Sequence, residues 1–280
     1  MNSIKNFVIQ GKHQKPIVTD VFYNNTQQRQ KVVVFCHGYK GFKDWGAWNR
    51  MAKLFADAGY FFIKFNFSHN GGTLSQPIDF PDLEAFGKNN YTKELDDLES
   101  VLDWISNNAQ FKNSIDSKQI SIIGHSRGGG IATIKAAEDP RIKNLISLAA
   151  VCDFASRSST NSELAVWKKT GVKYVLNGRT KQQMPHFYQF YENFIENKER
   201  LNIQRAAKQI TIPHLIIHGD KDTSVSQREG ESLHEWNPKS VLKIIENANH
   251  VFNISHPWNE KKGSKAFEKT IKICIDFLSQ

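Results

Sequence analysis

Six short runs of β-branched and aromatic residues recur along the chain, and each is almost entirely apolar. Such runs are typical of strands that are buried on both faces of a parallel sheet. Helical patterns separate most of them. This alternation predicts an α/β protein with a mostly parallel central sheet and helices on both faces. The runs are Val32–Cys36, Phe61–Phe67, Ile120–Ile123, Leu145–Val151, Leu215–Ile217 and Val241–Ile245.

Two other patterns flank these runs. Ile4–Ile9 and Ile17–Tyr23 alternate polar and apolar residues around a Gly11-Lys12-His13 turn, which predicts an antiparallel hairpin. Apolar residues spaced three and four apart predict two amphipathic helices, one in the middle of the chain and one at its end. Their apolar faces contain Leu95, Leu98, Leu102 and Ile105, and Phe267, Ile271, Cys274, Ile275 and Leu278.

One stretch interrupts the alternation of strands and helices. Between residues 154 and 207 the next strand is delayed by about fifty residues, which is longer than an ordinary loop. The stretch contains a possible hairpin at residues 174–180, with Asn177-Gly178 as its turn, and an aromatic segment at Phe187–Phe194. We expect a lid at 154–207, inserted into a single domain that spans residues 1–280.

A G-x-S-x-G motif, Gly124-His-Ser-Arg-Gly128, stands between a predicted strand and a predicted helix. In that position a sharp turn lifts the serine off the edge of the sheet, and glycines are needed where side chains would collide with the neighbouring strand and helix. The start of the helix offers unpaired N–H groups, which favour a negatively charged oxygen. The motif alone also fits a glycine-rich junction that only packs tightly, so partners for Ser126 decide between the two.

A serine nucleophile needs a base, and the base needs a carboxylate that orients it. In this topology the acid and then the histidine follow later strands. Asp222 comes just after one predicted strand and His250 just after the next, so both are expected at the same sheet edge as Ser126. Asp153 also follows a strand and is the alternative acid. We prefer Asp222 because its strand precedes that of His250 directly.

The same edge supplies donors for an oxyanion hole. The loop after the first parallel strand reads His37-Gly-Tyr-Lys-Gly41, and we expect the backbone N–H groups of Tyr39 and Arg127 to hold the oxyanion. Four features in the required order, each at the end of a strand, predict a serine hydrolase that uses Ser126, Asp222 and His250.

These residues resemble the conserved blocks of the α/β-hydrolase superfamily over residues 30 to 255, and within it the dienelactone hydrolase-like and prolyl-oligopeptidase-like esterases. These two groups include feruloyl esterases and acylglycerol lipases. The resemblance implies the α/β-hydrolase fold and hydrolysis of carboxylic esters, or less often of amides, without a cofactor. Arg127 departs from the family pattern, and the Ser68-His-Asn-Gly71 turn lacks the usual Arg-Gly. The matching blocks are His37–Asp44, Asn66–Gly71, Gly124–Gly128, His218–Asp222 and Asn249-His250.

Several other residues have competing interpretations. His37 and His125 flank the catalytic backbone positions, and a hydrogen bond that orders a loop is the simpler role for both. His214 and His218 have the spacing of a helical zinc pair, but on a strand they would lie about 13 Å apart, so we expect no metal site. Aromatic residues of the lid bind the substrate or pack the lid onto the core. The candidates for substrate binding are Trp167, Tyr174, Phe187 and Tyr191.

Composition and charge restrict the remaining possibilities. The chain has 280 residues, of which 39% are hydrophobic, and three scattered cysteines, so neither a disulfide framework nor a zinc ribbon is expected. We expect a cytoplasmic monomer or homodimer that acts on a small-molecule ester, with no membrane span and no cofactor. Alternatives are a peptidase acting on short or N-acylated peptides and a non-catalytic basic binding protein.

The formal net charge of +9 suggests a polyanion partner, but positive and negative residues are interleaved along most of the chain, so no nucleic acid is expected. A second hypothesis places the charge near the mouth of the site, where it would favour an anionic substrate. The residues in question are Arg127, Lys168, Lys169, Lys173 and Arg179.

Overall fold

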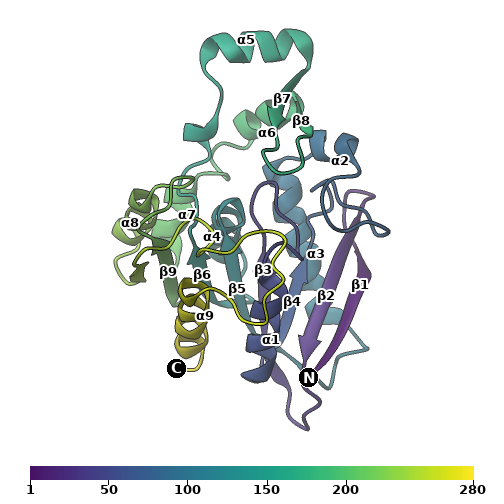
Figure 1. The fold of residues 1–280 in the computed structure, drawn as a ribbon, viewed down its shortest axis with the longest axis vertical. Helices are drawn as coiled ribbons and strands as arrows, with labels where there is room; N and C mark the ends of the chain where they lie inside the picture. Colours follow the sequence, from purple (N-terminus) through teal and green to yellow (C-terminus); the bar gives the residue numbers. More distant parts are fainter.

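All six predicted apolar runs lie in one eight-stranded sheet of the computed structural model, which describes residues 1–280 (Figure 1). The strand order is β1-β2-β4-β3-β5-β6-β9-β10. β1 and β2 form the predicted antiparallel hairpin, β2 pairs antiparallel with β4, and all other neighbours are parallel. The strands are β1 (Asn2–Gln10), β2 (Pro16–Tyr23), β3 (Gln30–Cys36), β4 (Phe61–Phe65), β5 (Ile115–His125), β6 (Ile142–Leu148), β9 (His214–Gly219) and β10 (Val241–Ile245).

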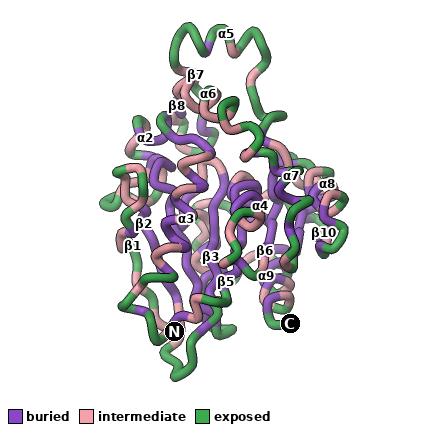
Figure 2. The backbone as a smooth tube through the Cα atoms, turned by 180° about the vertical axis from the view of Figure 1, so that it is seen from behind, coloured by how far each residue is buried: buried purple, intermediate pink, exposed green.

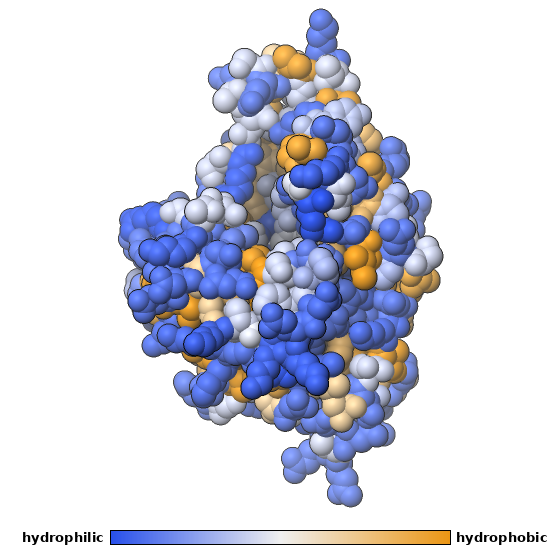
Figure 3. Space-filling view, in the orientation of Figure 1, coloured by the Kyte–Doolittle hydropathy of each residue, from blue (hydrophilic) through white to orange (hydrophobic).

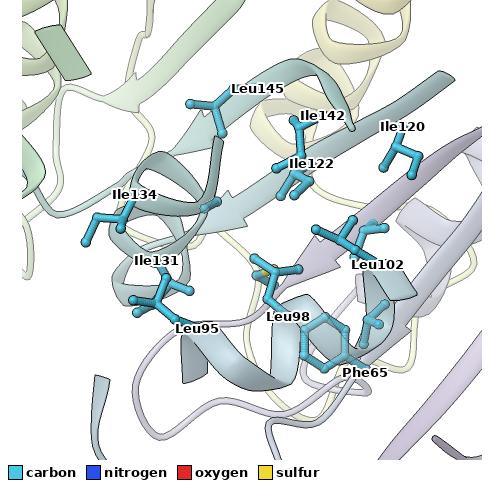
Figure 4. Close-up of a cluster of buried hydrophobic side chains, with 14 of the residues drawn as sticks. Phe65, Leu95, Leu98, Leu102, Ile120, Ile122, Ile131, Ile134, Ile142 and Leu145 are labelled. Carbon is cyan, nitrogen blue, oxygen red and sulfur yellow. The ribbon is translucent and has the colours of Figure 1, made fainter. Parts of the chain in front are cut away.

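Helices cover both faces of this sheet, and the strands contribute alternate side chains to each face. Val32 and Val34 of β3 pack with α3, α4 and α7, whereas Val33 and Phe35 pack on the opposite side with α1 and α9. Figure 4 shows the first cluster, and Figure 2 shows that the buried residues follow the sheet and its inner helices. The helices are α1 (Trp48–Asp57), α2 (Leu83–Gly87), α3 (Tyr91–Asn107), α4 (Arg127–Glu138), α7 (Ile203–Gln209), α8 (Gln227–Trp236) and α9 (Lys265–Leu278).

The stretch from 154 to 207, here called the inserted segment, connects β6 to β9. In Figure 1 most of it stands beyond the edge of the sheet where the parallel strands end, and α7 returns to the body. Its hairpin also touches the body at α2, because a Cβ on Gly87 would lie 3.0 Å from the Phe187 ring. The elements of the inserted segment before α7 are a 3-10 turn (Ala155–Arg157), α5 (Asn161–Thr170), β7 (Val172–Leu176), β8 (Gln183–Phe187) and α6 (Gln189–Glu196).

The hairpin of the inserted segment exists, but its turn differs from the predicted two-residue Asn-Gly turn. β7 and β8 are joined by residues 177–182, and the Asn177 N–H donates to the Gln182 carbonyl oxygen at 2.9 Å. The Asn177 side chain accepts a hydrogen bond from the Arg179 N–H at 3.1 Å. The buried Asn177 amide thus organises a wider loop from within.

No helix combines the length and the apolar character needed to cross a lipid bilayer.

Candidate active site

Ser126 occupies the sharp turn between β5 and α4, as its motif predicts. Its backbone has φ 56° and ψ −121°, a conformation that is strained for a residue with a side chain. Three backbone hydrogen bonds hold this turn: the Ser126 N–H donates to Leu148 O at 3.0 Å, and Ser126 O accepts from the N–H groups of Gly129 at 3.0 Å and Val151 at 3.1 Å. β6 ends three residues before the predicted limit, where Ala149 adopts a left-handed backbone conformation with φ 44°.

The two glycines of the motif are required by close approaches of backbone. A Cβ at Gly124 would lie 2.4 Å from the carbonyl oxygen of Gly128. A Cβ at Gly128 would lie 2.4 Å from the carbonyl oxygen of His37, at the end of the first parallel strand. The turn that contains Ser126 therefore packs tightly against both α4 and the loop after β3.

Asp222 and His250 meet beside this turn, although 28 residues separate them in sequence. The His250 Nδ1 and the Asp222 Oδ2 are 2.7 Å apart, and the Asp222 side chain is fully buried. The other carboxylate oxygen accepts from the N–H groups of Ser224 at 2.8 Å and Val225 at 2.9 Å. Burial alone would raise the pKa of Asp222, but hydrogen bonds from His218, His250 and Val225 hold it well below its usual range.

The alternative acid, Asp153, is engaged elsewhere. Its carboxylate oxygens accept hydrogen bonds from the N–H groups of Ala155 at 2.8 Å and Ser156 at 3.0 Å. Asp153 therefore closes the 3-10 turn at the start of the inserted segment. The His250 ring makes its hydrogen bond to Asp222 instead.

His218 is a partner of Asp222 that sequence reasoning missed. Its Nε2 lies 3.2 Å from Asp222 Oδ2 and 2.9 Å from the carbonyl oxygen of Val225, and its Nδ1 has no partner. Both neighbours of Nε2 accept hydrogen bonds, so the proton belongs on Nε2. The i, i+4 spacing of His218 to His214 is that of a zinc pair on a helix and does not predict this contact. His218 instead contacts Asp222 through a tight turn after β9.

His214 lies apart from this site. Its Nε2 contacts Ser147 Oγ at 2.9 Å inside the sheet. No group of three or more His, Cys, Asp or Glu side chains is arranged to hold a metal ion.

His37 and His125 order the loops on either side of Ser126. His125 Nε2 donates to the carbonyl oxygen of His250 at 2.9 Å, and burial lowers its pKa to about 3. His37 accepts from the Phe67 N–H at Nε2 and donates from Nδ1 to Gly38 O at 2.9 Å, and burial lowers its pKa to about 4. Both rings are therefore neutral at pH 7 and act as fixed hydrogen-bond partners of backbone.

The two expected oxyanion donors lie on opposite sides of Ser126. Arg127 is the first residue of α4, so its N–H has no partner within the helix. Tyr39 follows Gly38, which approaches so closely that a Cβ there would lie 2.8 Å from Ser126 Cβ. The Tyr39 hydroxyl and His186 Nε2, on β8, are 2.7 Å apart, which ties this loop to the inserted segment.

Ser126 and His250 open into one cavity of about 460 Å³ between the sheet edge and the inserted segment. Figure 3 shows the molecule hollowed below the end that carries α5. Of the four aromatic residues proposed to bind substrate, Trp167 and Tyr191 line the cavity. Tyr174 is 60% exposed, and Phe187 packs against α2. The remaining lining residues are Tyr39, Lys40, Tyr91, Arg127, Val151, Phe154, Arg157, Ser158, Lys173, Val175, His186, Phe190, Phe194, Ser224 and Val225.

The positive residues that were expected near the mouth separate into two groups. Arg127 and Lys173 line the cavity. Lys168 and Lys169 are exposed on α5, and Arg179 forms an ion pair with Asp79. The Arg127 guanidinium carbon lies 4.3 Å from the centre of the Tyr39 ring, and Nη1 lies 3.4 Å from the Glu94 carboxylate.

Comparison with known proteins assigns the fold. A family model described as alpha/beta hydrolase fold matches residues 31–182. The chain belongs to the α/β-hydrolase fold family. This confirms the fold class that the motifs predicted.

Individual relatives of this α/β hydrolase are distant. "Putative esterase/lipase 2" of Mycoplasma pneumoniae is 22% identical over 251 residues, which cover 82% of this chain and 86% of that protein. The structure of Est1E from Butyrivibrio proteoclasticus with ferulic acid bound has a TM-score of 0.73 at 16% identity and covers 98% of this chain and 100% of that one. The structure of the "Putative Dienelactone Hydrolase" from Klebsiella pneumoniae has a TM-score of 0.65 at 15% identity and covers 100% of this chain and 98% of that one.

Proposed function

We propose that this α/β hydrolase cleaves carboxylic esters through an acyl-enzyme on Ser126. The observation that carries the proposal is the meeting of three distant segments. Ser126 sits on a strained turn, His250 lines the same cavity, and the buried Asp222 binds His250 Nδ1 at 2.7 Å. The relative named "Putative esterase/lipase 2" supports the same reaction class, and the similar Est1E structure holds ferulic acid.

In the proposed mechanism, each residue has one task. Asp222 accepts the Nδ1–H of His250, which leaves Nε2 free to take the proton of Ser126 as its oxygen attacks the ester carbonyl. The N–H groups of Tyr39 and Arg127 hold the oxyanion of the tetrahedral intermediate. His250 returns its proton to the departing alcohol. Water then attacks the acyl-enzyme with His250 again as base, and the acid is released.

The inserted segment acts as the lid of this cavity in our proposal. Trp167, Phe190 and Phe194 of this segment line the cavity and present apolar surface to the acyl or alcohol group of the substrate. The Tyr39–His186 contact links this lid to the loop after β3 (His37–Gly41), here called the oxyanion loop.

Covalent labelling tests the nucleophile. A fluorophosphonate probe is expected to modify the wild-type protein on Ser126, and the adduct is located by peptide mass spectrometry. The Ser126→Ala variant should take up no label, whereas Ser158→Ala, which alters another serine of the same cavity, should retain it. Label on any other residue, or equal labelling of Ser126→Ala, would contradict the assignment.

The acid is tested by Asp222→Asn, with Asp153→Asn as the matched control. An amide in place of Asp222 favours the wrong tautomer of His250, so kcat for an aryl ester should fall by about 10³–10⁴-fold. Asp153→Asn should keep kcat within a few-fold, because Asp153 only closes a turn. Steady-state kinetics on 4-nitrophenyl esters and on aminoacyl anilides measure both variants and separate esterase from peptidase activity. A larger loss in Asp153→Asn would reverse the assignment of the acid.

A further inference from the structure

The wall of the cavity around Ser126 carries charge of one sign. Four cationic side chains line it, and no aspartate or glutamate does. They come from four places: Lys40 from the oxyanion loop, Arg127 from α4, Arg157 from the 3-10 turn and Lys173 from β7. A low-dielectric cavity lined by one sign of charge concentrates ligands of the opposite sign.

The two arginines are already neutralised by carboxylates of the protein. Arg127 Nη1 lies 3.4 Å from Glu94, and Arg157 Nη2 lies 2.6 Å from Glu229. Arg157 also donates to the carbonyl oxygen of Asp153 at 2.6 Å. These contacts hold both guanidinium groups in place and leave their charge largely compensated.

The two lysines differ from the arginines in this respect, because neither takes part in an ion pair within 4.0 Å. Lys173 Nζ donates to Ser159 Oγ at 2.7 Å and lies 3.9 Å from the centre of the Trp167 ring. Lys40 Nζ lies 5.1 Å from the centre of the Tyr39 ring. Hydroxyl and aromatic contacts orient an ammonium group but do not cancel its charge.

Burial makes these charges costly, because neither has an ion-pair partner. Both side chains are half-buried, and burial lowers the pKa of Lys173 against a smaller opposing effect of Glu163; burial and the charge of Arg127 lower the pKa of Lys40. His186 of β8 pairs with Lys173 of β7 in the hairpin and contacts the Tyr39 hydroxyl, next to Lys40 in the chain. Its pKa is lowered to about 3, mainly by burial and also by the charges of Arg127, Lys173 and Lys40. Positive potential therefore converges on the part of the cavity where β8 meets the oxyanion loop.

We propose that Lys40 and Lys173 form an anion subsite of the catalytic cavity, and that the substrate is an ester whose acyl or alcohol part ends in a carboxylate or phosphate group. This rests on the proposed esterase function. The aromatic walls, among them Trp167 and Phe190, hold the apolar part of such a molecule, and the two ammonium groups bind its charged end. Lys40 follows the oxyanion donor Tyr39 and Lys173 belongs to the inserted segment, so the two lysines bring positive charge to the same cavity from separate parts of the chain.

The test compares esters that differ only in their terminal charge. The substrates are mono-4-nitrophenyl adipate, its methyl ester and 4-nitrophenyl 6-phosphonooxyhexanoate, with eight-carbon homologues to vary the reach from Ser126. At low salt the wild-type protein should have a kcat/KM about tenfold higher for at least one anionic ester than for the neutral ester. This preference should decline as NaCl is raised. The carboxylate and phosphate esters show which anion is preferred.

Three variants identify the residues responsible. In Lys40→Gln and in Lys173→Gln the ratio of anionic to neutral kcat/KM should fall by roughly threefold each, a ratio that cancels any general change in the oxyanion loop. Lys169→Gln, an exposed lysine of α5, should leave the ratio unchanged. A wild-type ratio of one or less, or a ratio that neither cavity variant alters, overturns the anion subsite while leaving esterase activity intact.

Binding separates this proposal from failure of the esterase assignment. If none of these esters is hydrolysed, the proposed function is wrong, and isothermal titration of the same esters still tests the subsite. The anionic ester should then bind more tightly than the neutral one, and Lys40→Gln and Lys173→Gln should remove the difference. Equal binding of both esters in that experiment overturns the subsite as well.

Discussion

The Ser126 turn requires glycine at position 124, because a Cβ there would collide with backbone atoms, and backbone atoms cannot move aside as a side chain can. Gly124→Ala would place a Cβ 2.4 Å from the Gly128 carbonyl oxygen, so the start of α4 must shift. We expect a loss of about 1–3 kcal/mol in the free energy of unfolding and a fall of at least tenfold in kcat, because the shift moves Ser126 and the Arg127 N–H together.

The matched control for this substitution is Gly178→Ala, in the loop between β7 and β8. A Cβ there meets no atom within 4 Å, and its φ is not in the left-handed region. Urea unfolding and ester kinetics on both variants measure the effect. Equal behaviour of the two variants would show that the Ser126 turn tolerates a side chain at Gly124.

Between elements, the Tyr39–His186 contact is the link from the inserted segment to the oxyanion loop. Tyr39→Phe removes this hydrogen bond of 2.7 Å and keeps the ring against Arg127. Since a net hydrogen bond contributes about 1 kcal/mol, we expect kcat for a neutral aryl ester to fall by about fivefold while KM changes little. A rise in KM with kcat unchanged would indicate that the contact positions the substrate and not the oxyanion loop.

Tyr174→Phe is the matched control for that variant, because the Tyr174 ring is 60% exposed. It should leave both kinetic parameters unchanged. A parallel fall in kcat in both variants would mean that the inserted segment as a whole responds to loss of a hydroxyl, independently of the Tyr39–His186 contact.

A second contact between elements is a buried cluster of two lysines and two aspartates. Lys64 of β4 lies 2.6 Å from both Asp20 of β2 and Asp44, and Lys43 contacts the same two carboxylates. Lys64→Met leaves two buried carboxylates with one cation, so we expect a loss of about 3–5 kcal/mol in the free energy of unfolding. Lys31→Met, an exposed residue of β3, should change it by less than about 0.5 kcal/mol. Chemical denaturation measures both, and equal losses would contradict a structural role for the cluster.

For the molecule as a whole, the sequence predicts those features that depend on neighbouring residues in the chain or on the order of the strands. Apolar runs locate the parallel strands because burial on both faces requires continuous apolar residues. The turn at Ser126 could be predicted because close backbone contacts at positions 124 and 128 leave no room for a Cβ, so both positions require glycine. The pairing of Asp222 with His250 follows from the topology, since both lie at the ends of neighbouring parallel strands.

Contacts that depend on tertiary geometry could not be predicted in this way. His218 reaches Asp222 only because the chain doubles back after β9, and its spacing to His214, which argues against a shared metal, does not point to this contact. Phe187 and Trp167 look equivalent in sequence, yet one packs on α2 and the other lines the cavity. The loop of residues 177–182 depends on burial of Asn177, which no local pattern reveals. The charge of the cavity is likewise a property of four segments that meet only in the folded chain.

The stability of the whole chain should depend on pH through Asp97, a buried carboxyl of α3. Burial raises its pKa to about 7, against the smaller opposing effect of the hydrogen bond of 2.7 Å from the Ser68 N–H. The unfolded chain releases this proton near pH 4, whereas the folded chain keeps it until about pH 7. Folding therefore binds a proton across this interval, and the contribution of Asp97 to stability decreases as the pH rises from 4 to 7, with a slope of up to about 1.4 kcal/mol per pH unit.

Asp97→Asn removes the titrating proton and keeps an oxygen that can accept from Ser68, so it isolates this contribution. The free energy of unfolding of the variant, relative to wild type, should rise from pH 5 to pH 7 and level off above that. Urea titrations at four pH values between 5 and 8 measure the difference. The matched control is Asp116→Asn, because Asp116 is only half-buried near the start of β5 and takes part in no ion pair, and its difference from wild type should be constant over the same interval. A constant difference for Asp97→Asn as well would mean that Asp97 is ionised in the folded protein throughout, and that the Ser68 N–H outweighs the cost of burying its charge.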